Sequence, residues 1–265
     1  MFRALGWGIT HVIIGALFDR YSYTPVMVLS TMITSALFVT GIIMDQDKYS
    51  TTRNAELPKY SNNFACSLLK PFNLIFLLTL FSISMGSALV EGLVFMYFRN
   101  GLHLSNFLMG ITVMITVSFE IPLFFIGPVL SRTMGFTYMM IVGLLSYSIR
   151  VFVYTLATPD DIMILLLVEP LHGVTYTLIQ MSSVYFMSEL APPEYSNSGQ
   201  TVLSAIKAFG GGIGLLVGSF MFESFGTEFT YRAFGTFIGI MTCLFCLSRK
   251  CFVQQNTVYL ELTEI

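Results

Sequence analysis

The chain has 265 residues, of which 55% are hydrophobic and 11% are charged, and its mean hydropathy is +0.75. A soluble globular domain carries about twice as much charge, so the composition excludes one and indicates an all-α polytopic membrane protein. The net charge of −2 and the scattered Lys and Arg residues argue against a nucleic-acid partner. Partners are therefore to be sought in the lipid bilayer and among small solutes.

Eight apolar stretches are long enough to cross a bilayer as helices, which takes roughly 20 residues each. They cover residues 2–18, 25–44, 72–98, 105–130, 137–157, 162–187, 198–222 and 229–247. The connection between the second and third stretches is long, polar and irregular. We interpret this connection as a linker between two helical bundles.

Positive residues are unevenly divided between the two ends of the predicted helices. Eight of the thirteen Lys and Arg residues fall on the side that holds both termini and the linker, and three fall on the opposite side. Because cytoplasmic loops carry the excess of positive residues, we expect both termini to be cytoplasmic. The two remaining residues, Arg150 and Lys207, lie inside apolar stretches.

These observations predict four parts. They are the last two helices of an N-terminal bundle (1–44), a cytoplasmic linker (45–71), a complete six-helix C-terminal bundle (72–248) and a cytoplasmic tail (249–265).

Two segments have a similar layout of glycine, apolar residues, an acid and a turn into another helix. They are GALFDRYS (15–22) and GSFMFESFG (218–226). If each half of the protein ends with such a pair of helices, the half after the linker is complete with six helices, and the half before it keeps only its last two. A transporter built from two six-helix halves would then lack its first four helices here. We expect such a fragment to be inactive alone.

Three ionisable residues lie in the middle of two consecutive predicted helices: Arg150 in one, and Glu169 and His172 in the next. A charge at bilayer depth costs a few kcal/mol or more, so such residues normally face a protein interior or a water-filled cavity and mark functional sites. Glu169 and His172 are three residues apart and share one helical face.

Glu91 and Glu120 are further acids inside predicted helices. At 1.5 Å per residue, Glu91, Arg150 and Glu169 lie about 10 Å below the outer surface, with Glu120 and His172 deeper. We expect Arg150 to pair with Glu169 or Glu91, and the remaining acid to be able to load and release a proton. These five residues form a candidate pathway for substrate or protons, and a static network that braces the helices is the alternative.

Several single residues have two interpretations each. Pro122 and Pro170 each follow a glutamate closely and remove a backbone hydrogen bond, which either opens a binding cavity or only shapes packing. Tyr176 and Gln180 are polar residues that either line a cavity or hydrogen-bond between helices. His11 in the first helix is interpreted as a polar contact within the bundle.

Glycines recur every four residues at Gly210, Gly214 and Gly218. Such a small-residue stripe lets another helix approach closely, and we consider it a packing surface or a sliding surface for gating. Lys207, one turn earlier, either extends toward the cytoplasm or pairs with Glu120.

Several segments match one family in order and spacing. They are FRALGWGI (2–9), FEIPLFF (119–125), GPVLSRTMG (127–135), EPLHGVTYTLIQ (169–180) and APPEYSNSGQ (191–200). The chain resembles the major facilitator superfamily, and within it the lactose-permease-like branch, closest to the animal group called major facilitator superfamily domain-containing protein six. The resemblance covers the C-terminal two-thirds of that twelve-helix fold.

This resemblance implies roles for particular residues. In lactose permease, the matching helices carry an Arg, a Lys, a His and a Glu used in proton coupling and sugar binding. Arg150 matches the Arg and His172 matches the His, whereas Glu169 stands at the Lys position and Thr175 stands at the position of the proton-carrying Glu. The resemblance also implies that the loop around Arg132 takes part in gating.

We therefore expect a secondary active transporter that moves a small polar solute by alternating access, with protons as the candidate coupling ion. The alternative is a transporter-like membrane receptor or scaffold without transport, in which the ion pairs serve the fold. No nucleophile–base pair, phosphate-binding loop or metal-ligand spacing occurs in the sequence, so we expect neither an enzyme nor a cofactor.

Overall fold

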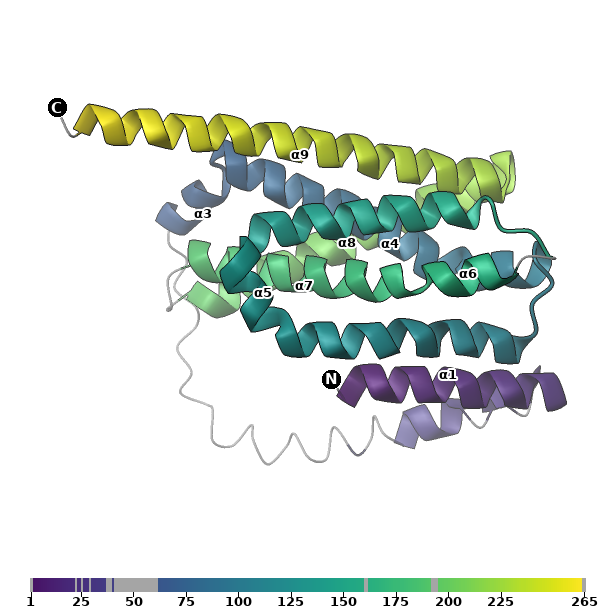
Figure 1. Ribbon diagram of the computed structural model, residues 1–265. Coiled ribbons are helices and arrows are strands. Elements are labelled where there is room, and N and C mark those ends of the chain that lie inside the picture. The colour runs from purple at the N-terminus through teal and green to yellow at the C-terminus, as the bar shows by residue number, and fades with distance from the viewer. Residues whose placement is uncertain are drawn as a thin grey trace.

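The computed structural model describes residues 2–21, 23, 24, 26–28, 30–36, 40, 62–159, 162–191 and 195–263. This part of the chain is built of helices, without a sheet (Figure 1). The helices are α1 (Phe2–Arg20), α3 (Asn62–Leu68), α4 (Pro71–Asn100), α5 (Asn106–Tyr154), α6 (Ile162–Val168), α7 (Pro170–Leu190), α8 (Ser196–Phe225) and α9 (Thr227–Thr263). The prediction of an all-helical fold is confirmed for these residues.

Helix α5 is a hairpin of two arms that bends at Gly135. Its 49 residues would extend about 74 Å if straight, more than twice the thickness of the hydrocarbon core. Gly135 has φ 72° and ψ 161°, a backbone conformation that residues with a Cβ rarely adopt. Figure 1 shows the two arms running in opposite directions. They correspond to the two stretches that we expected at 105–130 and 137–157.

Five helices in the described ranges are long and apolar enough to cross a membrane: α4, α5, α6 taken together with α7, α8, and residues Thr227–Arg249 of α9. This number is smaller than the eight spans expected. Helix α5 counts once although it has two arms, and α1, which carries charged residues at both ends, is not among the five. The expected span 25–44 includes residues outside the described part. Five such helices make the chain a multi-pass membrane protein.

Two helices extend into the regions that we expected to be a linker and a tail. Helix α3 lies at the end of the expected linker, whose residues 45–61 are outside the described part. Helix α9 continues through the expected tail as far as Thr263.

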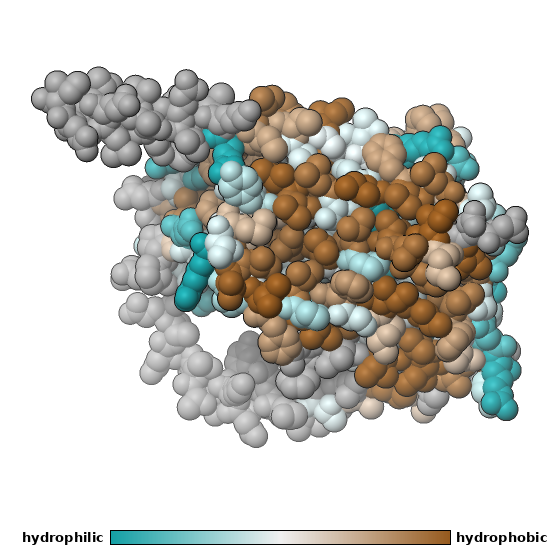
Figure 2. All heavy atoms as spheres, in the orientation of Figure 1, coloured by the Kyte–Doolittle hydropathy of each residue, from teal (hydrophilic) through white to brown (hydrophobic). Residues whose placement is uncertain are grey.

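Large apolar side chains are buried on the inside of the bundle and are also abundant on its outside. Inside, the Phe76 ring stacks on the Phe186 ring with centroids 3.9 Å apart, and the Phe136 and Phe245 rings meet Phe76 edge-on. Outside, Leu216 is 76% exposed, and Figure 2 shows a face dominated by hydrophobic atoms. Such a surface would promote aggregation in water but is suited to lipid contact.

The glycine stripe of α8 lies directly against α4. A Cβ at Gly210 would come within 2.7 Å of the Phe81 carbonyl oxygen, and a Cβ at Gly214 would overlap the Met85 backbone. Gly218 in turn lies against the Leu89 side chain. The absence of side chains at these positions therefore sets how closely α8 approaches α4.

Helix α1 packs along the first arm of α5 with similarly close contacts. A Cβ at Gly15 would overlap the Asn106 carbonyl, and a Cβ at Gly110 would lie 2.7 Å from the His11 carbonyl oxygen. Because backbone meets backbone at both points, α1 and α5 form a single rigid wall.

At one end of this wall, Asp19 of α1 binds the start of α5. Its Oδ1 accepts hydrogen bonds from the backbone N–H of Asn106 at 3.0 Å and from Asn106 Nδ2 at 2.7 Å. Its Oδ2 accepts from the backbone N–H of Phe107 at 2.8 Å. These N–H groups have no partner within the helix, so Asp19 stabilises the helix start from outside.

The hydrogen bonds of Asp19 determine its ionisation. Burial alone would raise the pKa of Asp19, but the hydrogen bonds from Phe107 and Asn106 and the positive charge of Arg99 outweigh burial and hold the pKa below its usual value. A lowered pKa in the folded state means that the ionised carboxylate stabilises the fold above the ordinary pKa of 3.8. This stabilisation is lost as the pH falls through the folded-state pKa.

We predict that Asp19→Asn lowers the free energy of unfolding by about 1 kcal/mol at pH 7, because one acceptor oxygen and the charge are lost at an exposed helix start. The difference from the wild type should shrink as the pH falls below 4. Thermal unfolding of the purified protein in detergent at several pH values measures the loss of stability and its pH dependence. Arg20→Gln, which leaves the Asp19 hydrogen bonds intact, is the control, and an equal difference at pH 7 and pH 3 would contradict the interpretation.

Candidate functional site

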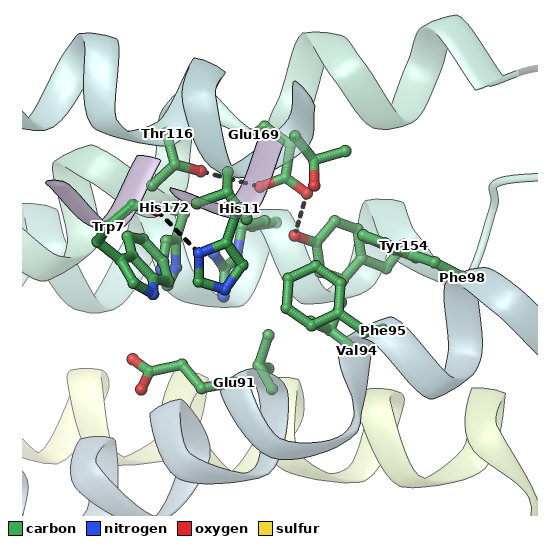
Figure 3. Close-up of a pocket in the computed structure, with 14 residues that line it drawn as sticks. Trp7, His11, Glu91, Val94, Phe95, Phe98, Thr116, Tyr154, Glu169 and His172 are labelled. Atoms are coloured by element: carbon green, nitrogen blue, oxygen red, sulfur yellow. Dashed lines mark hydrogen bonds between the residues drawn. The ribbon is translucent and has the colours of Figure 1, made fainter. Parts of the chain in front are cut away.

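A cavity of about 240 Å³ lies between α1, α4, α5 and the junction of α6 with α7. Its polar lining consists of His11, Glu91, Thr112, Thr116, Arg150, Tyr154, Glu169 and His172, and its apolar lining includes Trp7, Val94, Phe95 and Phe98. Figure 3 shows these side chains converging from the surrounding helices. Four of the five residues expected to form a substrate or proton pathway, namely Glu91, Arg150, Glu169 and His172, thus line one cavity.

Glu169 is held at the break between α6 and α7. Helix α6 ends at Val168 and α7 begins at Pro170, whose ring nitrogen has no hydrogen to donate. The backbone remains close to helical, because the Glu169 N–H donates to the Leu165 carbonyl at 3.2 Å. The break expected beside Pro170 is therefore present. At Pro122, in contrast, α5 keeps helical backbone angles, since Gly135 is its non-helical residue.

Both carboxylate oxygens of Glu169 accept hydrogen bonds from hydroxyl groups of α5. Tyr154 donates to Oε1 at 2.7 Å, and Thr116 donates to Oε2 at 3.2 Å (Figure 3). Glu169 itself is 5% exposed. The two donors come from opposite arms of the α5 hairpin, so Glu169 ties both arms to α7.

Arg150 lies beside this cluster without replacing the hydroxyl donors. Its guanidinium carbon is 5.4 Å from the centre of the Tyr154 ring, and the side chain is 1% exposed. We expected Arg150 to pair with Glu169 or Glu91. The hydrogen bonds to Glu169 come from Tyr154 and Thr116, and the pairing of Arg150 stays a prediction.

Two nitrogen atoms in the cavity lining lack hydrogen-bond partners. They are Arg150 Nε and His172 Nδ1, both of which are buried and unpartnered in the described structure. Leaving a buried polar atom unsatisfied costs about 1–3 kcal/mol. Both residues line the cavity, so its lining contains hydrogen-bonding capacity that the fold leaves unused.

Helix α1 contributes an aromatic wall. Trp7 is the one tryptophan in the chain, and its ring meets the His11 ring edge-on with the ring centres 5.0 Å apart. The His11 ring in turn stacks on the Phe95 ring of α4 with the centres 6.1 Å apart. His11 Nδ1 lies 2.8 Å from the Trp7 carbonyl oxygen. The interpretation of His11 as a polar contact agrees with this bond, but the residue also lines the cavity.

A second cavity of about 210 Å³ lies between α4, α7 and α8, and Glu91 lines both cavities. Tyr176 and Gln180 line the second cavity together with Lys207. Lys207 Nζ donates to Gln180 Oε1 at 2.6 Å. The partner of Lys207 is therefore an amide on α7, and neither of the two alternatives considered for Lys207 predicted it.

The remaining predicted residues lie elsewhere. Glu120 is buried on α5, beside Gly173 of α7, where a Cβ would come within 2.9 Å of the Glu120 nitrogen, and it is not in the lining of either cavity. Arg132 is exposed near the bend at Gly135. In the part of the chain that the structure describes, no group of three or more His, Cys, Asp or Glu residues could hold a metal ion.

Sequence reasoning missed Tyr154, Thr116 and Trp7. Tyr154 stands four residues after Arg150, so the helical period places both on one face, and this signal was available. Thr116 and Trp7 carry no comparable signal, because only the packing of α1 and α7 against α5 brings them to the cavity.

A comparison with protein families identifies the chain. A family model described as the MFS_1 like family matches residues 1–233. Because the match covers most of the chain, the protein belongs to this family of the major facilitator superfamily. Membership makes it a transporter-type membrane protein, and the family consists typically of transporters rather than enzymes.

We predict that Tyr154→Phe lowers the free energy of unfolding by about 1.5–3 kcal/mol, the range for a hydrogen bond to a charged group. The matched control is Tyr147→Phe, because the buried Tyr147 hydroxyl has no hydrogen-bond partner and its removal should cost less than about 0.5 kcal/mol. Thermal unfolding of both variants in the same detergent gives the comparison. Equal losses of stability would show that the Tyr154 hydroxyl does not anchor Glu169.

Proposed function

We propose that this protein is a secondary active transporter that moves a small polar solute by alternating access and couples the movement to protons. The observation that carries the proposal is the cavity at the α6–α7 junction, where Arg150 and His172 present unpartnered buried nitrogens. Cavities of this kind inside a membrane bundle, lined by charged residues beside a broken helix, are typical of transport sites.

The chemistry of the lining supports a polar solute. Aromatic side chains from α1 and α4 supply flat apolar surfaces, while Arg150, Glu169 and His172 supply donors and acceptors at one side. Binding sites commonly combine a mostly apolar wall with a few converging polar groups. A solute with hydroxyl or amide groups and an apolar face fits this combination.

Three residues are candidates for carrying the proton. His172 lines the first cavity, and Glu169 beside it accepts hydrogen bonds from the neutral hydroxyls of Thr116 and Tyr154. Glu91, which lines both cavities, is the third candidate. Glu120 would then act as a structural acid at the α5–α7 contact.

The proposed orientation places both termini and the bend at Gly135 in the cytoplasm. Figure 1 agrees with a common side for these three points, because the start of α1, the bend of α5 and the end of α9 lie toward one end of the bundle, and the excess of positive residues there favours the cytoplasm. Within the superfamily, we propose the lactose-permease-like branch, on the sequence segments that resemble it. The same resemblance assigns Arg132, near the bend, to gating, and the α4–α8 glycine contact would allow the two helices to slide.

We predict that proton-driven uptake by the protein in its full natural length falls at least tenfold in Arg150→Lys and in Glu169→Gln. Lysine cannot reproduce the planar set of guanidinium donors, and glutamine cannot exchange a proton. Uptake of a solute panel into cells at several pH values measures the effect. Glu189→Gln, an exposed position on α7, should retain uptake.

Normal surface expression without uptake of any solute would contradict the transporter proposal and favour a receptor or scaffold. The same conclusion would follow if the double variant Arg150→Met with Glu169→Met kept the biological activity of the protein.

A further inference from the structure

The second cavity contains a positive charge whose observed partner is neutral. Lys207 stands eleven residues after Ser196, the start of α8, which places it about 16 Å along a helix of about 45 Å, inside the apolar span. Its ammonium group donates to the Gln180 amide oxygen at 2.6 Å. An ammonium group has three donors, so this contact leaves donors and positive charge available to a ligand.

A second residue with an unpartnered polar atom lines the same cavity. Thr175 lines it and is only 3% exposed, so it is more than nine-tenths buried. Its hydroxyl Oγ1 has no hydrogen-bond partner. Lys207 and Thr175 belong to different helices, α8 and α7, and both contribute donors to one space of about 210 Å³.

The other walls restrict the occupant. Ile83 and Ala88 of α4 and Ile179 of α7 provide apolar surface, and Ser84 and Ser87 add small hydroxyl groups. A charge in a low-dielectric interior is tolerated when it is paired. The lining therefore suits a small molecule with one anionic head and a short apolar body.

We propose that Lys207, Thr175 and Gln180 form a subsite that binds the carboxylate of a small monocarboxylate solute. The proposal rests on the transporter function proposed above and names its substrate class. Glu91 lines the same cavity, so the positive charge of Lys207 is available to one carboxylate when Glu91 is protonated, whereas a doubly charged phosphate would leave an excess negative charge. The carboxylate accepts hydrogen bonds from Lys207 Nζ and Thr175 Oγ1, and Gln180 orients the lysine.

The test measures the thermal unfolding midpoint of the purified protein in the presence of acetate, propionate or lactate. The corresponding amides and inorganic phosphate, at equal ionic strength, are the comparison ligands. We expect a saturable rise of the midpoint with at least one of the carboxylates, and none with the amides or with phosphate. A ligand that binds only the folded state raises its stability in this way.

Three variants locate the effect. In Lys207→Gln the charge is lost, and in Gln180→Glu a carboxylate of the protein itself competes for the lysine. Each should weaken the apparent carboxylate affinity at least tenfold. Thr175→Val, which preserves the shape of the side chain, should weaken it several-fold. Lys70→Gln removes an exposed lysine that precedes α4 and should bind as the wild type does.

The subsite is wrong if no carboxylate raises the midpoint, if the amides or phosphate act equally well, or if Lys207→Gln binds as tightly as the wild type. Its failure is distinguishable from failure of the transporter proposal. Uptake of a neutral solute with the same KM in the wild type and in Lys207→Gln would overturn the subsite and leave transport standing. Carboxylate binding that requires Lys207, in a protein that takes up no solute, would support the subsite and overturn transport.

Discussion

The hydrogen bonding of one buried carboxylate holds the centre of this bundle together. Glu169 interrupts a membrane-spanning segment, and its oxygens accept hydrogen bonds from Thr116 on one arm of α5 and Tyr154 on the other. A carboxylate away from water is unfavourable unless it is hydrogen-bonded. The hydrogen bonds to the Glu169 carboxylate therefore fix how the α5 hairpin meets α7. The cavity lies beside this contact, where Arg150 Nε and His172 Nδ1 have no hydrogen-bond partner.

The contacts of α1 and α8 complete the two cavities. Helix α1 closes the first one from the side, because Gly15 and Gly110 permit backbone contact with α5 and Asp19 anchors one end of α1 to the start of α5. Helix α8 closes the second, because its glycine stripe packs against α4 and its Lys207 donates a hydrogen bond to Gln180 of α7. Since Glu91 lines both cavities, a change in its charge would change the electrostatic potential in each of them.

The positions of the helices and the candidate charges were predictable from the sequence. The length of an apolar stretch, and the presence in it of a charge that is costly in lipid, can both be read from a short segment. The break beside Pro170 was predictable for the same reason. The partners of those charges were not. Arg150 was expected to pair with Glu169 or Glu91, and sequence reasoning did not find the hydroxyl donors Tyr154 and Thr116 on Glu169 or the Gln180 acceptor of Lys207. Helix rotation and packing decide such choices, and neither is encoded in spacing alone.

The central claim is that the cavity at the α6–α7 junction is a water-accessible solute site and not a sealed structural network. A membrane-impermeant thiol reagent tests it directly in a variant whose four native cysteines are replaced, because the reagent needs a hydrated thiolate. Phe95→Cys, in the cavity lining, should be labelled, and Leu216→Cys, 76% exposed on the apolar outside, should not. Absence of labelling at position 95, or equal labelling at both positions, would contradict the account.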